Sequence, residues 1–254
     1  MMKKWFLGLC LLCPVFLFAQ DFLGDKYVYS YHQENLTPRI ELCKNSPIQA
    51  YYDSLKSIYD AEMGIVIGES QQELKVFKPQ SPLSNLLTDM VYEYADSLAQ
   101  SRKNPKVDLT ILNFGGIRGN IPQGDITIGT IYSVLSFDNL IVIASMKGSE
   151  LQKVFKRFTA KYNQPYSHAK VTYLGDDPIE ILVNGEKIDA EKTYRVATLD
   201  FLVFNNGDGI FDGVTFENIE ETNVLFRDIL LNYVKKKRVV DAQLDDRVVI
   251  KPQK

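Results

Sequence analysis

VDLTILNFGGIRGNIPQGDITIGTIYSVLSFDNLIVIASM (residues 107–146) is the stretch of the chain with the densest structural signals. Val107–Leu112 is rich in β-branched and aliphatic residues, which predicts a buried strand. Gly115 and Gly116 follow; two glycines at a strand end can take positive φ angles and let a ligand approach the backbone closely. Arg118 then offers a planar, charged fork of donors that suits phosphate or carboxylate.

The second half of this stretch predicts a helix, a loop and a strand. Thr127 is placed to cap a short helix over Ile128–Leu135. A loop over Ser136–Asn139 leads into a second apolar strand, Leu140–Ser145. Each feature alone has an ordinary explanation: a glycine pair is often only a turn, a lone arginine a solvated charge, and Phe137 plain core. Their order and spacing together indicate a small-molecule site.

This succession of motifs resembles the C-terminal, substrate-specificity domain of the 5'-nucleotidases and UDP-sugar hydrolases. The matching pieces are Asn-x-Gly-Gly-Ile-Arg at Asn113–Arg118, Pro-x-Gly-x-Ile-Thr at Pro122–Thr127, Phe-x-Asn at Phe137–Asn139 and Gly-x-Glu-Leu at Gly148–Leu151. The resemblance extends over residues 40–250. The combination is far more specific than a single glycine-rich loop.

The remaining elements follow from hydrophobic periodicity and turn residues. Helices are predicted from Pro47 and over 82–98, 149–158 and 222–234, strands over 170–173, 179–183, 186–188, 194–199 and 247–250, a hairpin over 66–77, and a loop over 200–213. Helices and strands interleave irregularly. We therefore expect an α+β (α/β mixed-sheet) single domain with helices packed on mixed β-sheets.

The first twenty residues have the pattern of a secretory signal peptide. Lys3 and Lys4 form a charged start, Trp5–Phe18 an apolar segment, and Ala19 a small residue for cleavage. No later apolar run is long enough to span a membrane. The product is expected to be exported, periplasmic or extracellular.

The cysteines bear on membrane anchoring, and the net charge bears on the kind of partner. Cys10 and Cys13 lie in the leader, and lipid anchoring is the weaker alternative because neither follows the small residue that a lipoprotein site needs. Residues 21–40 are expected to be a lead-in segment, and residues 41–254 the domain. A formal net charge of −3 argues against a nucleic-acid partner, whose binding surface would be basic.

No catalytic centre is predicted in this chain. Whole 5'-nucleotidases resemble it only in their second half; their first half is a metallophosphoesterase that holds two divalent metals. This chain has only two histidines, His32 and His168, neither in a metal-binding context, so no catalytic residue, metal ligand or cofactor is assigned to it. The resemblance implies that divalent metals belong to a separately encoded metallophosphoesterase partner.

The resemblance implies instead a pocket for a nucleotide or nucleoside. One stacking ring would be Phe137, and stacking on an aromatic ring is worth about 1–3 kcal/mol per base. The segment that carries the second ring is one residue longer than usual, so Phe201 and Phe204 both stay candidates, with Phe201 the closer match. Asp208 would accept hydrogen bonds from the ribose hydroxyls.

The other pocket residues come from the two loops of the central stretch. Asn113 and Asn139 would lie near the base, Gly115 and Gly116 would allow close backbone approach, and Arg118 would help to hold the charged part of the ligand. The sequence departs from the family at Lys75, Phe77 and Lys78, where further arginines are usual. Lysine supplies charge without the bidentate geometry, so the pocket could prefer a nucleoside to a nucleotide.

Three hypotheses for the function follow. In the first, the chain is the recognition half of an exported 5'-nucleotidase, active in nucleotide catabolism by phosphate-ester hydrolysis with a separate catalytic partner. In the second, it is a non-catalytic exported protein that binds nucleosides or related small ligands. In the third, the pocket is vestigial. The intact motifs at Asn113–Arg118 and Phe137–Asn139, with Asp208, favour the first two hypotheses over the third.

Overall fold

The computed structural model describes residues 47–252. The chain divides into two compact units, Met1–Tyr51 and Tyr52–Lys254. Helix α2 (Pro47–Met63) begins in the first unit and continues into the second. All other described elements belong to the second unit, and the account below concerns that unit. The predicted signal peptide and lead-in segment lie outside the described residues.

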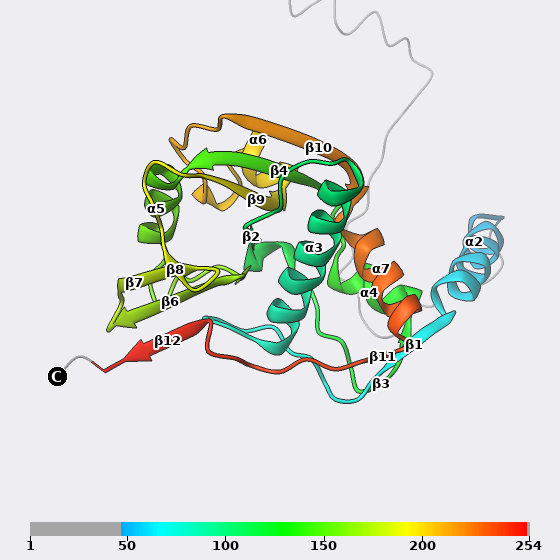
Figure 1. Ribbon diagram of the computed structural model, residues 1–254. Helices are drawn as coiled ribbons and strands as arrows, with labels where there is room; N and C mark the ends of the chain where they lie inside the picture. Colours follow the sequence, from blue (N-terminus) through cyan, green and yellow to red (C-terminus); the bar gives the residue numbers. More distant parts are fainter. Residues whose placement is uncertain (1–46, 253–254) are drawn as a thin grey trace, which may run out of the picture. The chain divides into compact units, whose positions relative to one another are not determined.

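The largest sheet of the second unit is mixed and has five strands in the order β10-β4-β9-β2-β5 (Figure 1). Its strands are β2 (Leu109–Ile111), β4 (Leu140–Lys147), β5 (Tyr166–Ser167), β9 (Thr193–Leu199) and β10 (Asn218–Leu225). β4 pairs antiparallel with both β9 and β10, whereas β2 runs parallel to β9. β4 is buried along nearly its whole length, which explains its continuous aliphatic run.

Two smaller sheets complete the strand arrangement. The first has the order β11-β1-β3 and contains β1 (Val66–Ser70), β3 (Gly124–Thr127) and β11 (Val239–Val240). The second has the order β12-β6-β7-β8 and contains β6 (Ala169–Leu174), β7 (Asp177–Val183), β8 (Glu186–Lys187) and β12 (Val248–Lys251). Both contain parallel and antiparallel pairs, because strands from the end of the chain join them.

Helices cover these sheets and enclose one hydrophobic core. They are α3 (Pro82–Ser101), α4 (Ile128–Val134), α5 (Gly148–Arg157), α6 (Asp200–Phe204) and α7 (Phe226–Lys237). The long helix α3 starts at a capping box between Ser81 and Ser84 with Pro82 in its first turn. It packs against β2, β5 and α7. The predicted α+β fold with helices on mixed sheets is confirmed.

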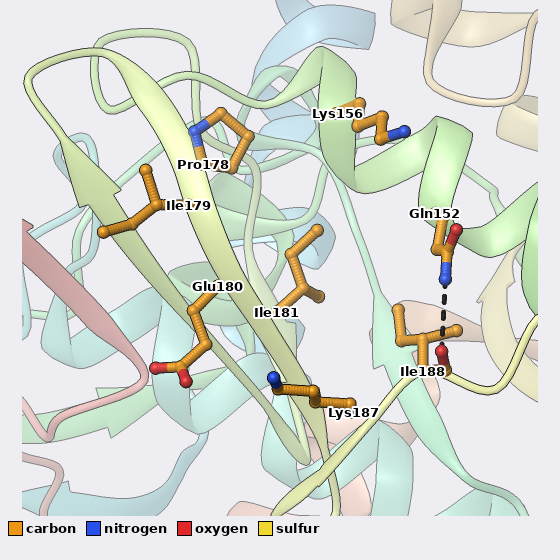
Figure 2. A pocket seen from close by; sticks show the side chains of 8 residues that line it. All are labelled: Gln152, Lys156, Pro178, Ile179, Glu180, Ile181, Lys187 and Ile188. Atoms are coloured by element: carbon orange, nitrogen blue, oxygen red, sulfur yellow. Dashed lines mark hydrogen bonds between the residues drawn. The ribbon is translucent and has the colours of Figure 1, made fainter.

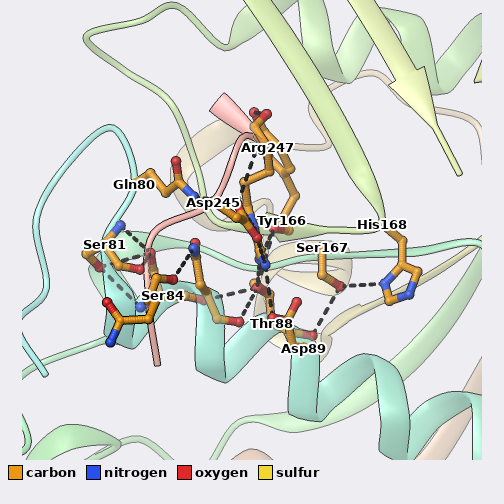
Figure 3. Close-up of polar contacts among 12 residues, drawn as sticks. Gln80, Ser81, Ser84, Thr88, Asp89, Tyr166, Ser167, His168, Asp245 and Arg247 are labelled. Atoms are coloured by element: carbon orange, nitrogen blue, oxygen red, sulfur yellow. Dashed lines mark hydrogen bonds and ion pairs between the residues drawn. The ribbon is translucent and has the colours of Figure 1, made fainter. Parts of the chain in front are cut away.

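A network around Arg247, which we call the Arg247 clasp, ties the last strand to α3 (Figure 3). The Arg247 guanidinium donates from Nε to Asp245, from Nη1 to Thr88 Oγ1 and the Tyr166 carbonyl, and from Nη2 to Asp89 and Asp245, over 2.6–3.1 Å. The Tyr166 hydroxyl donates back to the Arg247 carbonyl at 3.2 Å. Every guanidinium nitrogen therefore has a partner.

Three predictions of local structure are wrong. The expected hairpin over 66–77 does not form, because β1 pairs with β3 and β11 while Leu74 forms an isolated bridge with Ile121. The C-terminal helix starts at Phe226 and not at residue 222, since residues 218–225 form strand β10. The predicted loop over 200–213 contains helix α6 and a 3₁₀ turn, η3 (Gly207–Gly209). Among the described residues, no helix combines the length and the apolar character needed to cross a membrane.

Candidate functional site

The glycine-rich motif forms a tight turn at the end of β2. Residues 114–116 make one 3₁₀ turn, η2 (Phe114–Gly116), and the Phe114 amide donates to Gln164 Oε1 at 3.0 Å. Neither Gly115 nor Gly116 has a positive φ, so that part of the prediction is wrong. They are needed for close approach: a Cβ at Gly115 would lie 3.0 Å from Asp208 Oδ2, and one at Gly116 would lie 2.8 Å from Asn113 Oδ1.

The Phe137 loop follows helix α4, which Thr127 caps as predicted through a capping box with Thr130. Phe137 is 49% exposed, so its ring is not part of the core. The loop is held at its far end by the main chain, where the Phe226 amide donates to the Asn139 carbonyl at 2.9 Å. The centre of the Phe137 ring lies 5.9 Å from Cζ of Arg118. The Arg118 motif and the Phe137 loop therefore face one another.

A third segment runs through α6 and η3. The ring of Phe201 lies directly over Gly207, where an added Cβ would come within 2.2 Å of a ring carbon. Asp208 has a left-handed backbone, with φ of 54°, which Asp tolerates better than most residues. Its Oδ2 accepts a hydrogen bond of 2.7 Å from Asn113 Nδ2. This bond connects the third segment with the glycine-rich turn.

These three segments enclose a cavity of about 270 Å³ at one end of the five-stranded sheet. Its lining consists of Asn113, Gly115, Gly116, Arg118, Phe137, Asn139, Phe201 and Asp208. All eight are residues that the sequence analysis assigns to a ligand pocket. The ninth, Phe204, is 54% exposed and is not part of the lining. That any of them contacts a ligand stays a prediction.

The polar groups of this cavity are only partly engaged by the protein. Asn113 is 4% exposed, yet its Oδ1 has no hydrogen-bond partner among the described residues. Arg118 is exposed and makes one long hydrogen bond, from Nη1 to the Gly115 carbonyl at 3.4 Å. The lining contains one cation, Arg118, and one carboxylate, Asp208. The cavity thus offers a free acceptor, a free donor fork and two rings, with no net formal charge.

The lysines at the position of the family's additional arginines lie outside the lining. Lys75 is exposed and pairs with Glu73 at 3.1 Å. The Lys78 amine lies 5.7 Å from the centre of the Phe114 ring, next to the glycine pair, and Phe77 is 45% exposed. These residues therefore add no arginine-type fork to the cavity.

Two residues that the sequence analysis did not identify hold the aromatic segments. Asp200 Oδ1 accepts hydrogen bonds from the Leu140 amide at 3.0 Å and the Phe201 amide at 2.7 Å, so one carboxylate joins the ends of two cavity-lining segments. Arg227 in α7 contacts the loop that carries Phe137. Neither role could be found from spacing, since Leu140 lies 60 residues from Asp200 and the loop partners of Arg227 lie 89 and 92 residues from it.

A larger cavity, of about 340 Å³, lies between α5 and the β7–β8 hairpin (Figure 2). Its lining is Gln152, Lys156, Pro178, Ile179, Glu180, Ile181, Lys187 and Ile188. The figure shows Gln152 and Lys156 on the helix and the aliphatic side chains on the hairpin, with Gln152 Nε2 donating to the Ile188 carbonyl at 3.1 Å. None of the ligand-binding motifs of the sequence contributes to this groove.

The described residues do not form a metal centre. Within residues 47–252, no group of three or more His, Cys, Asp or Glu side chains is placed to hold an ion. His168 stacks on Tyr92 with ring centroids 3.3 Å apart, and burial lowers its pKa from the ordinary value. His32 lies outside the described residues.

Comparison with known families gives one match that covers most of the described fold. Residues 66–215 match the family described as 5'-nucleotidase, C-terminal domain. This range is 150 of the 254 residues and contains all eight residues that line the cavity.

Individual relatives agree with this match. The chain is 28% identical over 193 residues to protein UshA of Yersinia enterocolitica and 25% identical over 217 residues to protein UshA of Escherichia coli, covering 74% and 80% of this chain. It spans only 33% and 37% of those two proteins. A crystal structure of a 5'-nucleotidase precursor from Thermus thermophilus superimposes with a TM-score of 0.66 at 25% identity, covering 80% of this chain and 43% of that one.

Proposed function

Because the chain belongs to the family of 5'-nucleotidase C-terminal domains, we propose that it is the nucleotide-recognition half of a 5'-nucleotidase. A separate metallophosphoesterase chain would supply the dimetal site that hydrolyses the phosphate ester. The relatives are about three times as long as their matching part, which leaves room in them for a catalytic half. We further propose that the chain is exported after removal of residues 1–20, and mass spectrometry of the mature product tests this.

The observation that carries the proposal is the convergence of three separate sequence motifs on one cavity. Two rings, Phe137 and Phe201, come from different segments and could hold a flat base between them. The buried, unpartnered Asn113 Oδ1 would accept a hydrogen bond from a donor on the ligand. A cavity with aromatic walls and a few free polar groups is the usual form of a small-molecule site.

The remaining groups suit the sugar and the phosphate side of a nucleotide. A carboxylate is an acceptor only, so Asp208 would take hydrogen bonds from two hydroxyls of a ribose. Arg118 would place its guanidinium toward the negative part of the ligand, because its fork is otherwise bound only weakly. In this chain these residues bind and orient; the bond-breaking step would take place on the partner.

One observation favours a second function, that of an exported nucleoside-binding protein. The cavity has a single cation, balanced by one carboxylate, and Lys75 and Lys78 lie outside its lining. A site with no net positive charge gives little preference for a phosphate. In this alternative the chain would bind adenosine about as tightly as AMP. It would have no catalytic partner.

Phosphate release and ligand binding together distinguish these functions. Release from AMP and UDP-glucose with divalent metal is measured for the purified chain, alone and with an exported metallophosphoesterase from the same organism. Calorimetry with adenosine compares the wild type, Phe137→Ala and the control Tyr162→Ala, which removes an exposed ring outside the cavity. We expect release only with the partner. Phe137→Ala should lower both release and adenosine affinity without abolishing binding, and Tyr162→Ala should change neither.

Other outcomes point elsewhere. Adenosine binding without any effect of a partner would support the second function. Turnover by the pure chain would show that it contains a catalytic site after all. Absence of both binding and turnover would leave the vestigial pocket as the explanation.

A further inference from the structure

A buried arginine at the start of α7 supports the loop that carries Phe137. The side chain of Arg227 is 8% exposed. It stands in the first turn of the helix, where the helix dipole disfavours a positive charge. Its Nε has no hydrogen-bond partner among the described residues. Arg227 is therefore poorly suited to stabilise its own helix, and its contacts with other elements have to explain its position.

Those contacts all go to helix α4 and the loop after it. Nη1 donates to the Leu135 carbonyl at 3.2 Å, and Nη2 donates to Asp138 Oδ1 at 2.5 Å. The guanidinium also lies over the ring of Tyr132, with 4.2 Å from Cζ to the ring centre. The Arg227 guanidinium thus contacts Leu135 and Asp138, which lie on either side of Phe137 in the chain. It also contacts helix α4, which leads into the loop.

The loop needs such support because it has little of its own. Residues 136–138 are exposed, and Phe137 does not bury its ring in the core. A loop without buried side chains loses conformational entropy when it is ordered, and specific contacts have to offset that loss. Leu135 is buried at one end, and the Asn139 carbonyl is bonded to the Phe226 amide at the other. Between these ends, Arg227 supplies a bond to the side chain next to Phe137.

We propose that Arg227 is a positioning residue for the stacking ring of Phe137. It acts through the loop and does not touch the ligand, since it is not part of the cavity lining. This inference rests on the proposed function, because it assumes that Phe137 stacks on a base. It extends that function by assigning control of the cavity's shape to a residue on a different element.

A double-mutant cycle tests the proposal by adenosine calorimetry on the full-length chain. Arg227→Met is measured in the wild type and in Phe137→Ala. We expect Arg227→Met to weaken adenosine binding about fivefold in the wild type and to have no effect once the ring is absent, because residues acting through one another are not additive. An equal loss in both backgrounds, or none in either, would overturn the proposal.

Arg195→Met is the matched control for the loss of a buried arginine. Arg195 is 11% exposed and pairs with Glu220 at 2.5 Å, a bond that lowers the pKa of that carboxyl. It lies in β9 and outside the cavity lining. Arg195→Met should lower the unfolding midpoint without changing adenosine affinity. Asp138→Ala, at a side chain that is 77% exposed, removes one partner of Arg227 with little risk to folding and should weaken binding in the same direction.

A fluorescent reporter separates a failure of this inference from a failure of the proposed function. Trp5 is the only tryptophan of the sequence, so Phe137→Trp in a Trp5→Phe background gives one fluorophore at the loop. Arg227→Met should raise its acrylamide quenching and lower its anisotropy without any ligand, and Arg195→Met should change neither. An unchanged signal would refute the positioning role. A changed signal in a chain that does not bind adenosine would refute only the proposed function.

Discussion

The Arg247 clasp and the cavity each combine arginine, carboxylate and aromatic side chains, but they differ in how many of their polar groups are satisfied. In the clasp, all three guanidinium nitrogens of Arg247 have partners within 3.1 Å (Figure 3). In the cavity, Arg118 has one hydrogen bond at 3.4 Å, and the buried Asn113 Oδ1 has none among the described residues. Buried polar groups are normally paired, so an unpaired one calls for an explanation.

We expect this difference to separate a structural network from a candidate ligand site. A complete network has no capacity left for a ligand, and removing one member leaves the others without partners. In a site with free donors and acceptors, the unpaired polar groups destabilise the empty protein. A ligand that forms hydrogen bonds with them removes this destabilisation. Substitutions in the clasp should therefore change stability, and substitutions in the cavity should change affinity.

The largest effect is expected for Arg247→Met. It removes the hydrogen bonds to Asp89, Asp245, Thr88 and the Tyr166 carbonyl. The carboxylates are about half exposed, but several hydrogen bonds of one buried guanidinium are lost together, which should lower the free energy of unfolding by about 3 kcal/mol. Urea unfolding measures this loss, and calorimetry should find the adenosine affinity of the folded variant unchanged. Arg118→Met, at an exposed arginine, should instead leave the stability unchanged and weaken the binding of AMP. Equal stability losses in both variants would contradict the distinction.

The second effect concerns the two candidate rings. Phe201→Ala removes a ring from the cavity lining and should weaken adenosine binding by about 1–3 kcal/mol, the usual cost of losing one stacking partner. Phe204→Ala, three residues away and outside the lining, should leave the affinity unchanged. Titration calorimetry of the two variants decides between the rings. A loss only in Phe204→Ala would mean that the segment shifts when a ligand binds.

The elements that could be predicted from the sequence are those whose structure depends on a few neighbouring residues. The cap at Thr127 and the strand over residues 140–145 depend on adjacent residues, and the structure contains both. Strand β10 was mistaken for the start of a helix because its stability comes from pairing with β4, about 75 residues earlier. The predicted hairpin over 66–77 is absent for the same reason, namely pairing with distant segments: its first strand, β1, pairs with β3 and β11.

The candidate site shows the same limit. Residues that line the cavity belong to short motifs and could be named from the sequence. Arg227 could not, because an arginine near a helix is ordinary, and its position against the helix dipole becomes apparent only once the helix is known to start at Phe226. Asp200 and Gln164 likewise act on main-chain amides of distant segments. What holds a site in shape is therefore harder to predict than what faces its ligand.

A smaller effect is expected for Asp208→Asn. Asparagine tolerates the left-handed backbone of this position, so the fold should be kept. The substitution replaces a charged acceptor by a neutral amide, which should weaken the binding of adenosine by about 1 kcal/mol. In the wild type, 2'-deoxyadenosine should bind more weakly than adenosine, and the variant should lose most of this difference. An unchanged preference for ribose would show that Asp208 does not contact the sugar hydroxyls.

The smallest expected effect is a pH dependence of the stability that Asp245 contributes through the Arg247 clasp. Partial burial alone would raise the pKa of Asp245, but the hydrogen bonds from Arg247 outweigh it, and the pKa lies below the ordinary value. A carboxyl whose pKa is lower in the folded than in the unfolded chain stabilises the fold above its unfolded pKa of about 3.9, and this contribution is lost as the pH falls through the lower, folded value. The wild type should therefore lose more stability between about pH 5 and pH 2 than Asp245→Asn, which cannot titrate at this position. Urea unfolding at several pH values measures both curves, and adenosine affinity relative to folded protein should not follow the difference between them. Parallel stability curves would show that Asp245 contributes no charge-dependent stability, and the clasp would then depend on Thr88 and Asp89 of α3 and on the Tyr166 carbonyl of β5.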